Sequence, residues 1–218
     1  MKYTCISAAN IEPARANSAS THTCELIRDL LVAQDAGAQV TILPLIDYEL
    51  RPCRMCGQCL TGGFCTRDEA FNAVYRAMRA ADAVFLVCPH YAPLPSKVMI
   101  LMEKLEEIAF LNYCADANCR LPLYRKPVGI VAHGGRIEDA AALAYYRTAL
   151  LEPLATDLES VQMRVIGAGE EAPRGVVFGI KTLSMRPGSI FVDITQDWEA
   201  VRQRLVPLVT NVVASLAA

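Results

Sequence analysis

Ala83-Val84-Phe85-Leu86-Val87-Cys88 is the stretch that decides the fold, because it is apolar without interruption. A strand with one face in water alternates apolar and polar side chains, whereas an unbroken apolar run is typical of a strand buried on both faces of a parallel sheet. Pro89 stops the run abruptly. We therefore expect residues 83–88 to form a central strand of an α/β sheet.

The segments on either side alternate between strand and helix patterns. A strand, a polar loop, a helix that begins near Ser18 or Ser20 and a second strand form a unit that normally builds a parallel sheet with right-handed crossovers. The predicted fold is a doubly wound α/β sandwich with five parallel strands in the order 2-1-3-4-5 and helices on both faces. The other predicted strands cover residues 3–6, 39–43, 126–132 and 163–167, and later helices cover residues 96–112, 137–151 and 198–216.

The composition fits one compact domain over residues 1–218, with 53% hydrophobic residues and a net charge of −2. This charge balance argues against nucleic acid and anionic lipid as partners. Neither a signal peptide nor a membrane-spanning run is recognisable, so we expect a soluble cytoplasmic protein. Residues 170–195 carry short alternating patches that fit an added hairpin or an excursion toward a partner subunit.

Ligands of such sheets bind beyond the carboxyl ends of the strands, where the strand order reverses. Three loops are expected there, over residues 7–21, 89–95 and 133–136. The first loop combines hydroxyl groups, an amide and a cation with a helix start, which is a pattern that can cradle a phosphate or merely cap the helix. It has neither a Walker ending nor a glycine fingerprint. Its candidate ligands are Ser7, Arg15, Asn17, Ser18, Ser20 and Thr21.

The other two loops are candidates for holding a flat ring. Tyr91 could stack on such a ring and His90 could donate a hydrogen bond to it, although His90 also fits an ordinary loop histidine. Gly134 and Gly135 permit close backbone approach to a ligand, or else simply turn the chain from strand to helix. A later glycine pair at residues 167–169 follows a strand but leads into Pro173, so we interpret it as a turn.

A compact cysteine run lies in a loop over residues 51–66 and favours a metal centre. Its spacing is C-x2-C-x2-C-x5-C, with thiols at Cys53, Cys56, Cys59 and Cys65. A four-thiolate iron–sulfur cluster, a structural zinc ion and free thiols all fit this spacing, and the cluster fits best. Neighbouring arginines would favour thiolates in each case.

These landmarks together resemble the NADPH-dependent FMN reductases of flavodoxin-like fold, and among them the iron–sulfur flavoproteins. The shared features are the hydroxyl-rich first loop, the cysteine run followed by Asp68-Glu69, the Pro-x-Tyr loop at Pro89 and the glycine turn after His133. The resemblance covers most of residues 1–155. The chain departs from the family in its longer, glycine-free first loop and in His90, where an aliphatic residue is common.

The resemblance implies an FMN-dependent oxidoreductase that transfers electrons through FMN and a 4Fe-4S cluster. Ser7, Asn17, Ser18, Ser20 and Thr21 would hold the FMN phosphate. The electron donor would be NAD(P)H and the acceptor a quinone-like compound or a protein such as ferredoxin. The alternatives are a non-enzymatic electron carrier or redox sensor, and a flavin reductase with zinc or no metal at the cysteines. Family members are commonly homodimers or homotetramers. The isoalloxazine ring would be lined by Pro89, His90, Tyr91, Ala92, Pro93, His133, Gly134 and Gly135.

Overall fold

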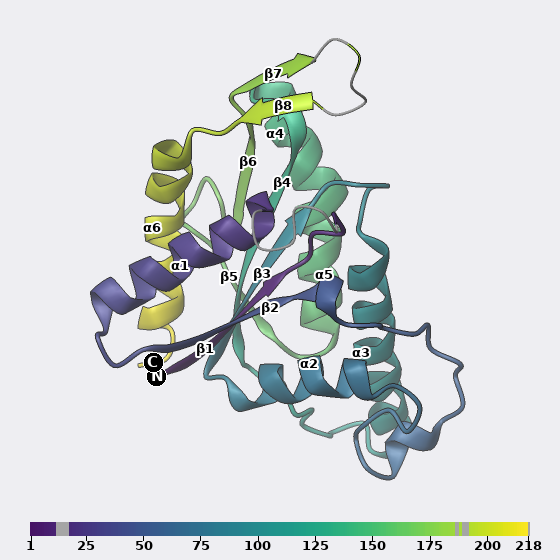
Figure 1. The fold of residues 1–218 in the computed structure, drawn as a ribbon. Coiled ribbons are helices and arrows are strands. Elements are labelled where there is room, and N and C mark those ends of the chain that lie inside the picture. Colours follow the sequence, from purple (N-terminus) through teal and green to yellow (C-terminus); the bar gives the residue numbers. More distant parts are fainter. Residues whose placement is uncertain (12–17, 186–187, 189–191, 218) are drawn as a thin grey trace.

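The computed structural model describes residues 1–11, 18–185, 188 and 192–217. Its main sheet contains β1 (Lys2–Ser7), β2 (Gln39–Pro44), β3 (Ala83–Pro89), β4 (Pro127–Ile137) and β5 (Arg164–Ile166). These strands are parallel and follow the order β2-β1-β3-β4-β5, which confirms the predicted topology (Figure 1). Every residue of β3 is buried, as its apolar run predicts.

A sixth strand joins this sheet, which the prediction of five strands did not include. β6 (Val176–Ile180) pairs with β4 in parallel, beside His133 and its neighbours, whereas β5 pairs with the earlier part of β4. The chain leaves the sheet after β5 through a turn, as expected for residues 167–169, and returns at Gly175. Gly175 has a φ of 142°, and a Cβ there would lie 2.3 Å from the carbonyl oxygen of Ile130, so the return requires glycine.

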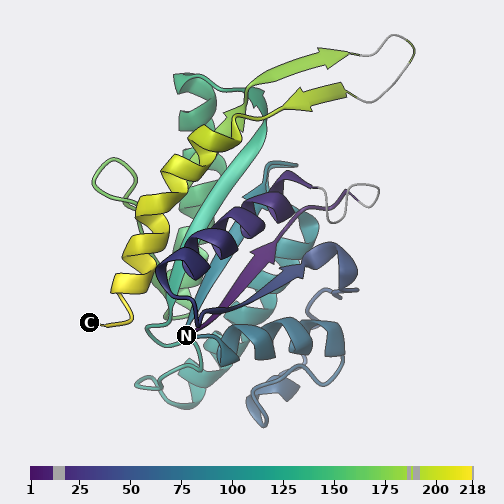
Figure 2. The same ribbon diagram turned by 60° about the vertical axis from the view of Figure 1, so that its left-hand side comes forward.

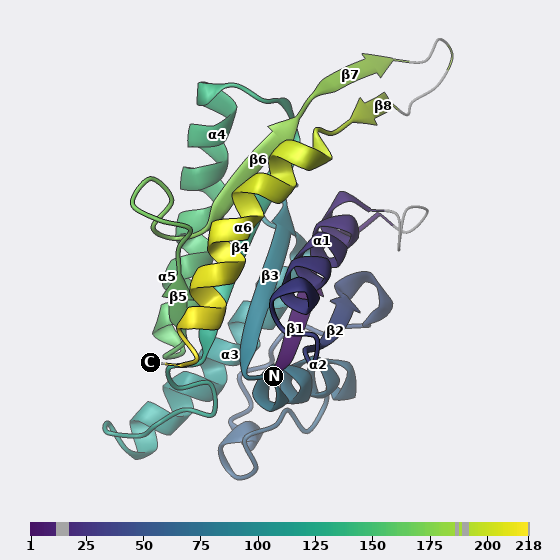
Figure 3. The ribbon, with the colours of Figure 1, turned by 90° about the vertical axis from the view of Figure 1, so that its left-hand side faces the viewer.

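Helices cover both faces of the sheet. α1 (Ala19–Gln34) and α6 (Trp198–Ala214) cover one face, and α2 (Glu69–Ala80), α3 (Ser96–Ala115) and α5 (Glu152–Ser160) cover the other (Figure 3). The helix predicted over residues 137–151 begins later and continues further: α4 (Ala140–Tyr146) passes through a π-helical turn (Arg147–Leu151) into α5. α6 contains Pro207 and is continuous through it. No helix in the described part of the chain is both long and apolar enough to cross a membrane.

A two-stranded ribbon projects beyond the main sheet. It consists of β7 (Thr182–Met185) and β8 (Val192–Thr195), which pair antiparallel between β6 and α6 (Figure 2). The hairpin that the sequence allowed within residues 170–195 is therefore present. The ribbon and the cysteine-rich loop lie at opposite ends of the molecule (Figures 1 and 3).

Candidate functional site

The three predicted loops converge on one cavity of about 430 Å³ at the carboxyl edge of the sheet. Because β1, β3 and β4 are parallel neighbours, the loops that follow β1 and β3 and the end of β4 emerge on the same side. The structure thus brings together most of the described residues that the sequence singled out. The predicted residues that line the cavity are Ser18, Ser20, Pro89, His90, Tyr91, His133, Gly134 and Gly135.

The first loop forms both a helix cap and a polar wall of the cavity. Ser18 caps α1, because its Oγ accepts a hydrogen bond of 3.1 Å from the Thr21 backbone N–H. Ser7 and Thr21, which were also predicted to bind the phosphate, are buried and not among the lining residues, and their hydroxyl oxygens are 2.9 Å apart. Ser18 and Ser20 remain at the cavity, beside the positive end of the α1 dipole. Arg15 and Asn17 lie outside the described residues, so their predicted roles stay predictions.

His133 is a buried neutral group behind this wall. Its Nε2 and the Ser20 Oγ share a hydrogen bond of 2.8 Å, and its ring stacks on Phe178 with centroids 4.9 Å apart. The side chain is enclosed, with 6% of the residue exposed, and burial lowers the pKa of His133 to about 4. His133 is therefore uncharged at neutral pH and acts as a hydrogen-bonding partner for α1.

The Pro89–Pro95 loop is fixed by its own hydrogen bonds. The His90 N–H donates to the His133 carbonyl oxygen at 2.6 Å, and the Tyr91 N–H donates to the Pro93 carbonyl oxygen at 2.7 Å. His90 Nε2 lies 2.8 Å from the Tyr145 hydroxyl, and burial together with the charge of Arg136 lowers the pKa of His90. His90 and Tyr91 face the cavity. Ala92 and Pro93, which were also predicted to line the ring, are not among its lining residues.

The two glycines after His133 have different roles. Both lie within β4 rather than in the turn that the sequence allowed, because the strand continues to Ile137. A Cβ on Gly134 would lie 2.4 Å from the Tyr146 ring, so this glycine is required by packing inside the protein. A Cβ on Gly135 would meet no atom within 4 Å, so close approach to a ligand is open at Gly135.

The remaining wall comes from the segment around the ribbon, which the sequence analysis could not place. Ile180, Ile194 and Trp198 contribute apolar surface, and Gln196 adds a polar group. The Gln196 Oε1 is buried and has no hydrogen-bond partner among the described residues. A buried acceptor without a donor is costly, so it fits a ligand that brings an N–H group. A flat ring with a polar edge, such as a flavin, has this character.

The four cysteines of the predicted metal centre line a second cavity, of about 620 Å³, near the middle of α3. Among the described residues, no group of three or more His, Cys, Asp or Glu side chains is arranged to hold a metal ion. The donor chemistry nevertheless fits a metal centre, because Cys53, Cys56, Cys59 and Cys65 share one cavity. The charged groups that line that cavity are one carboxylate, Glu107, and four cations, Arg51, Arg54, Arg67 and Lys104.

The electrostatics of the cysteine cavity differ between its thiols, because burial, together with the charge of Glu107, raises the pKa of Cys59. A backbone hydrogen bond from Gln58, followed by the charge of Arg67, lowers the pKa of Cys56. Cys5, Cys24 and Cys88 are buried in the core, as predicted, and all cysteines in the structure are free thiols.

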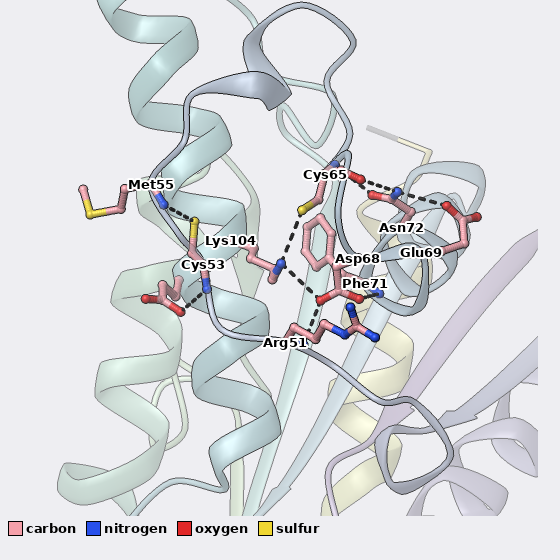
Figure 4. Close-up of polar contacts among 10 residues, drawn as sticks. Arg51, Cys53, Met55, Cys65, Asp68, Glu69, Phe71, Asn72 and Lys104 are labelled. Atoms are coloured by element: carbon pink, nitrogen blue, oxygen red, sulfur yellow. Dashed lines mark hydrogen bonds and ion pairs between the residues drawn. The ribbon is translucent and has the colours of Figure 1, made fainter.

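A buried ion pair supports the floor of this cavity, and the sequence analysis missed its lysine (Figure 4). The Asp68 carboxylate accepts hydrogen bonds from the Phe71 N–H at 2.9 Å and the Arg51 N–H at 2.8 Å, and it lies 3.1 Å from Lys104 Nζ. Burial raises the pKa of Asp68, but these donors outweigh it and hold the pKa below its usual range. The signal for Lys104 was its place on the apolar stripe of α3, between Leu101 and Leu105.

Comparison with known proteins points to one family. The model of the NADPH-dependent FMN reductase family matches residues 13–169, which is more than half of the chain. An iron–sulfur flavoprotein of Methanosarcina thermophila is 30% identical over 76 residues, which cover 34% of this chain and 40% of that protein. The chain thus matches less than half of the length of this relative.

Solved structures show the same fold at low sequence identity. The structure of RosB with bound 8-demethyl-8-formylriboflavin-5'-phosphate has a TM-score of 0.60 at 16% identity, and the match covers 100% of this chain and 79% of RosB. The FMN-dependent NADH-azoreductase of Bacillus anthracis in complex with FMN has a TM-score of 0.55 at 13% identity, with 100% of each chain covered.

The neutral state of His133 predicts a specific pH dependence of stability. The unfolded chain takes up a proton on this histidine below about pH 6.5, whereas the folded chain takes it up only near pH 4. Folding therefore loses about 3 kcal/mol from this residue as the pH falls between those values. His133→Gln cannot titrate, so its free energy of unfolding should fall less than that of the original protein between pH 7 and pH 4 in urea titrations without added FMN.

The comparison needs only these two proteins, because the substitution removes one titratable group and changes no other. Parallel stability curves for His133→Gln and the original protein would show that His133 is not held neutral by the fold.

Proposed function

This chain belongs to the NADPH-dependent FMN reductase family, and we propose that it is an FMN-dependent oxidoreductase whose FMN binds in the cavity between Ser18, Tyr91 and Gly135. The observation that carries the assignment of the site is the convergence of the three predicted loops on one cavity at the point where the strand order reverses. The bound RosB ligand and the FMN of the Bacillus anthracis azoreductase, both on the same fold, support it.

The protein side of the reaction is binding, orientation and exclusion of water. FMN, when bound, supplies the redox chemistry by accepting a hydride and releasing electrons. Ser18 and Ser20, at the N-terminus of α1, are placed to bind its phosphate. The apolar wall of Ile180, Ile194 and Trp198 and the open space above Gly135 suit the ring. The unpartnered Gln196 Oε1 suits an N–H on the ring's polar edge.

Added charge at the helix cap tests the phosphate site. Ser18→Asp keeps a good N-cap but places a negative charge where the phosphate would bind, while Ser18→Asn keeps the cap without the charge. We expect Ser18→Asp to weaken FMN binding by about 1.5 kcal/mol or more, roughly tenfold, and Ser18→Asn to change it little. Fluorescence titration of the metal-free protein measures both. Equal FMN affinities for the two variants would place the phosphate elsewhere.

We propose NADPH or NADH as the hydride donor, because the family is defined by NADPH-dependent reduction of FMN. The competing function is an electron carrier or redox sensor that exchanges electrons only with a protein. The relative from Methanosarcina thermophila is named an iron–sulfur flavoprotein, and this name is compatible with the second function as well. Quinone-like compounds are the acceptor class proposed for the enzyme.

Direct reduction distinguishes the two functions. Anaerobic mixing of the FMN-loaded protein with NADPH or NADH should bleach the flavin absorbance within seconds, because the family is described as NADPH-dependent. An electron carrier would stay oxidised with both nucleotides but would be reduced rapidly by reduced ferredoxin. That second pattern would overturn the enzyme assignment.

We further propose that Cys53, Cys56, Cys59 and Cys65 hold a 4Fe-4S cluster. The support is their compact spacing, their shared cavity, its lining of cations and the match to the iron–sulfur flavoprotein. The cluster, when present, would pass single electrons to or from a partner. The loop must draw its sulfurs closer together to bind it, and the left-handed conformation of Gly57, with a φ of 68°, already turns the chain between two of the ligands.

Removal of one ligand tests this centre. Cys56→Ala should lose most of the iron of anaerobically reconstituted protein, because three thiolates bind the cluster less firmly, while FMN content stays unchanged. Cys114→Ala is the matched control, since Cys114 is an exposed thiol outside the run. Iron and acid-labile sulfide assays report the result. Equal iron in the two variants would remove Cys56 from the ligand set.

We propose that the chain forms a homo-oligomer through the ribbon. Leu183 pairs with Ile194 and Met185 with Val192, so these four apolar side chains share one face of the ribbon. All four are exposed, Met185 at 72%. A two-stranded ribbon is at best marginally stable alone, so a second copy that covers this face would stabilise it.

Neighbouring positions on opposite faces of the ribbon test this assembly. Met185→Lys should weaken association by about 2 kcal/mol or more, because it buries an unpaired charge, whereas Ser184→Lys on the other face, opposite Asp193, should not. Light scattering at several protein concentrations measures the change. The same oligomeric state for both variants would exclude the apolar face of the ribbon from the interface.

A further inference from the structure

A buried lysine borders the cysteine cavity in an arrangement that stability alone does not explain. The side chains of Lys104 and Asp68 are 4% and 2% exposed. Removing two charges from water costs several kcal/mol per ion, and well-packed apolar residues are often as stable as a buried ion pair. The pair therefore points to a use for the lysine charge at this place.

The third group of this arrangement is a cysteine sulfur. Lys104 Nζ lies 3.1 Å from the Asp68 carboxylate and 3.4 Å from Cys65 Sγ, so the ammonium group bridges the two (Figure 4). An ammonium has three N–H donors and no acceptor, so it can serve the carboxylate and the sulfur at once. The Lys104 charge is thereby directed toward one corner of the cysteine cavity.

Asp68 is itself held in place, which fixes the lysine. Its carboxylate caps α2 by accepting from the Phe71 N–H, and it also accepts from the Arg51 N–H at the start of the cysteine loop. The loop beyond is tied to α2 as well, because the Cys65 N–H donates to Asn72 Oδ1 at 2.9 Å. Hydrogen bonds and the ion pair therefore link Lys104, Asp68 and Cys65 across α3, α2 and the loop.

We propose that Lys104 is a positioning residue for the metal centre: its ammonium holds the Cys65 sulfur toward the cavity and places a fixed positive charge beside that ligand. This inference rests on the proposed metal centre at the cysteines. A positive charge and a hydrogen bond on a ligand sulfur strengthen metal binding and stabilise the more reduced, more negative state of a cluster. Lys104 thus raises both the metal affinity and the reduction potential of the centre.

The arginines of the same cavity do not replace Lys104. Arg51, Arg54 and Arg67 are exposed, so water and salt screen their charges, whereas the buried Lys104 acts through a medium of lower dielectric constant. Lys104 also donates its hydrogen bond to Cys65 from a side chain that Asp68 holds in place.

Two variants separate a role in metal binding from a role in stability. Lys104→Met removes the charge but leaves Asp68 buried without its partner, so this variant should lose thermal stability. The double variant Lys104→Met/Asp68→Asn removes both charges while asparagine keeps the α2 cap, so much of that stability should return. Lys97→Met is the control, because Lys97 lies on the same helix, donates to the Ile46 carbonyl oxygen and lines neither cavity.

The probe for affinity is Co²⁺, titrated anaerobically into the metal-free protein and followed by its thiolate charge-transfer absorption. We expect both variants that lack Lys104 to bind Co²⁺ about tenfold or more weakly than the original protein, and Lys97→Met to bind it normally. Redox titration of the iron-reconstituted proteins should show a more negative midpoint potential in the same two variants.

Three outcomes have different meanings. If the double variant regains the Co²⁺ affinity and the potential of the original protein together with its stability, Lys104 is only structural and the inference is wrong. The inference is also wrong if the original protein binds metal and neither variant changes that binding. If the original protein binds neither iron nor Co²⁺, the proposed metal centre falls and this inference falls with it, while the FMN site is unaffected.

Discussion

The burial of β3 on both faces is the constraint on which the rest of the structure depends. A strand without a polar face needs a strand on each side and a helix layer above and below, and right-handed crossovers between parallel strands provide both. All strands of the main sheet then end at the same edge. The loops after β1 and β3 and the end of β4 meet there because of the topology, and the cavity that we assign to FMN is the result.

The sequence predicted this part of the molecule well because its signals are local and strong. Apolar runs, a serine cap and proline stops define the elements that flank the cavity, and the strand order follows from their alternation. The role of Gly134 could not be predicted from the sequence. Glycine is required there because Tyr146, from a later helix, packs against it. The sequence could show that a glycine was needed there but not which atom excludes a side chain.

Elements that depend on distant partners were harder to predict. The apolar run of residues 176–180 is typical of a buried strand, but its pairing with β4 beyond β5 depends on residues far away in the sequence. The ribbon brings Ile194 and Gln196 to the cavity only after the chain has left the sheet and returned. The place of Lys104 on an apolar stripe gains a meaning only when Asp68 and Cys65, from two other segments, lie around its ammonium group.

The central claim is that one chain carries FMN and an iron–sulfur cluster in two separate cavities, which share no lining residue. An absorption spectrum of anaerobically purified protein, with FMN, iron and acid-labile sulfide assays on the same sample, tests it most directly. The account predicts flavin peaks on a broad shoulder and about four irons per chain. A protein that contains FMN but no iron would show that the cysteine run is a loop of free thiols and not a cluster site. A protein without FMN would contradict the account.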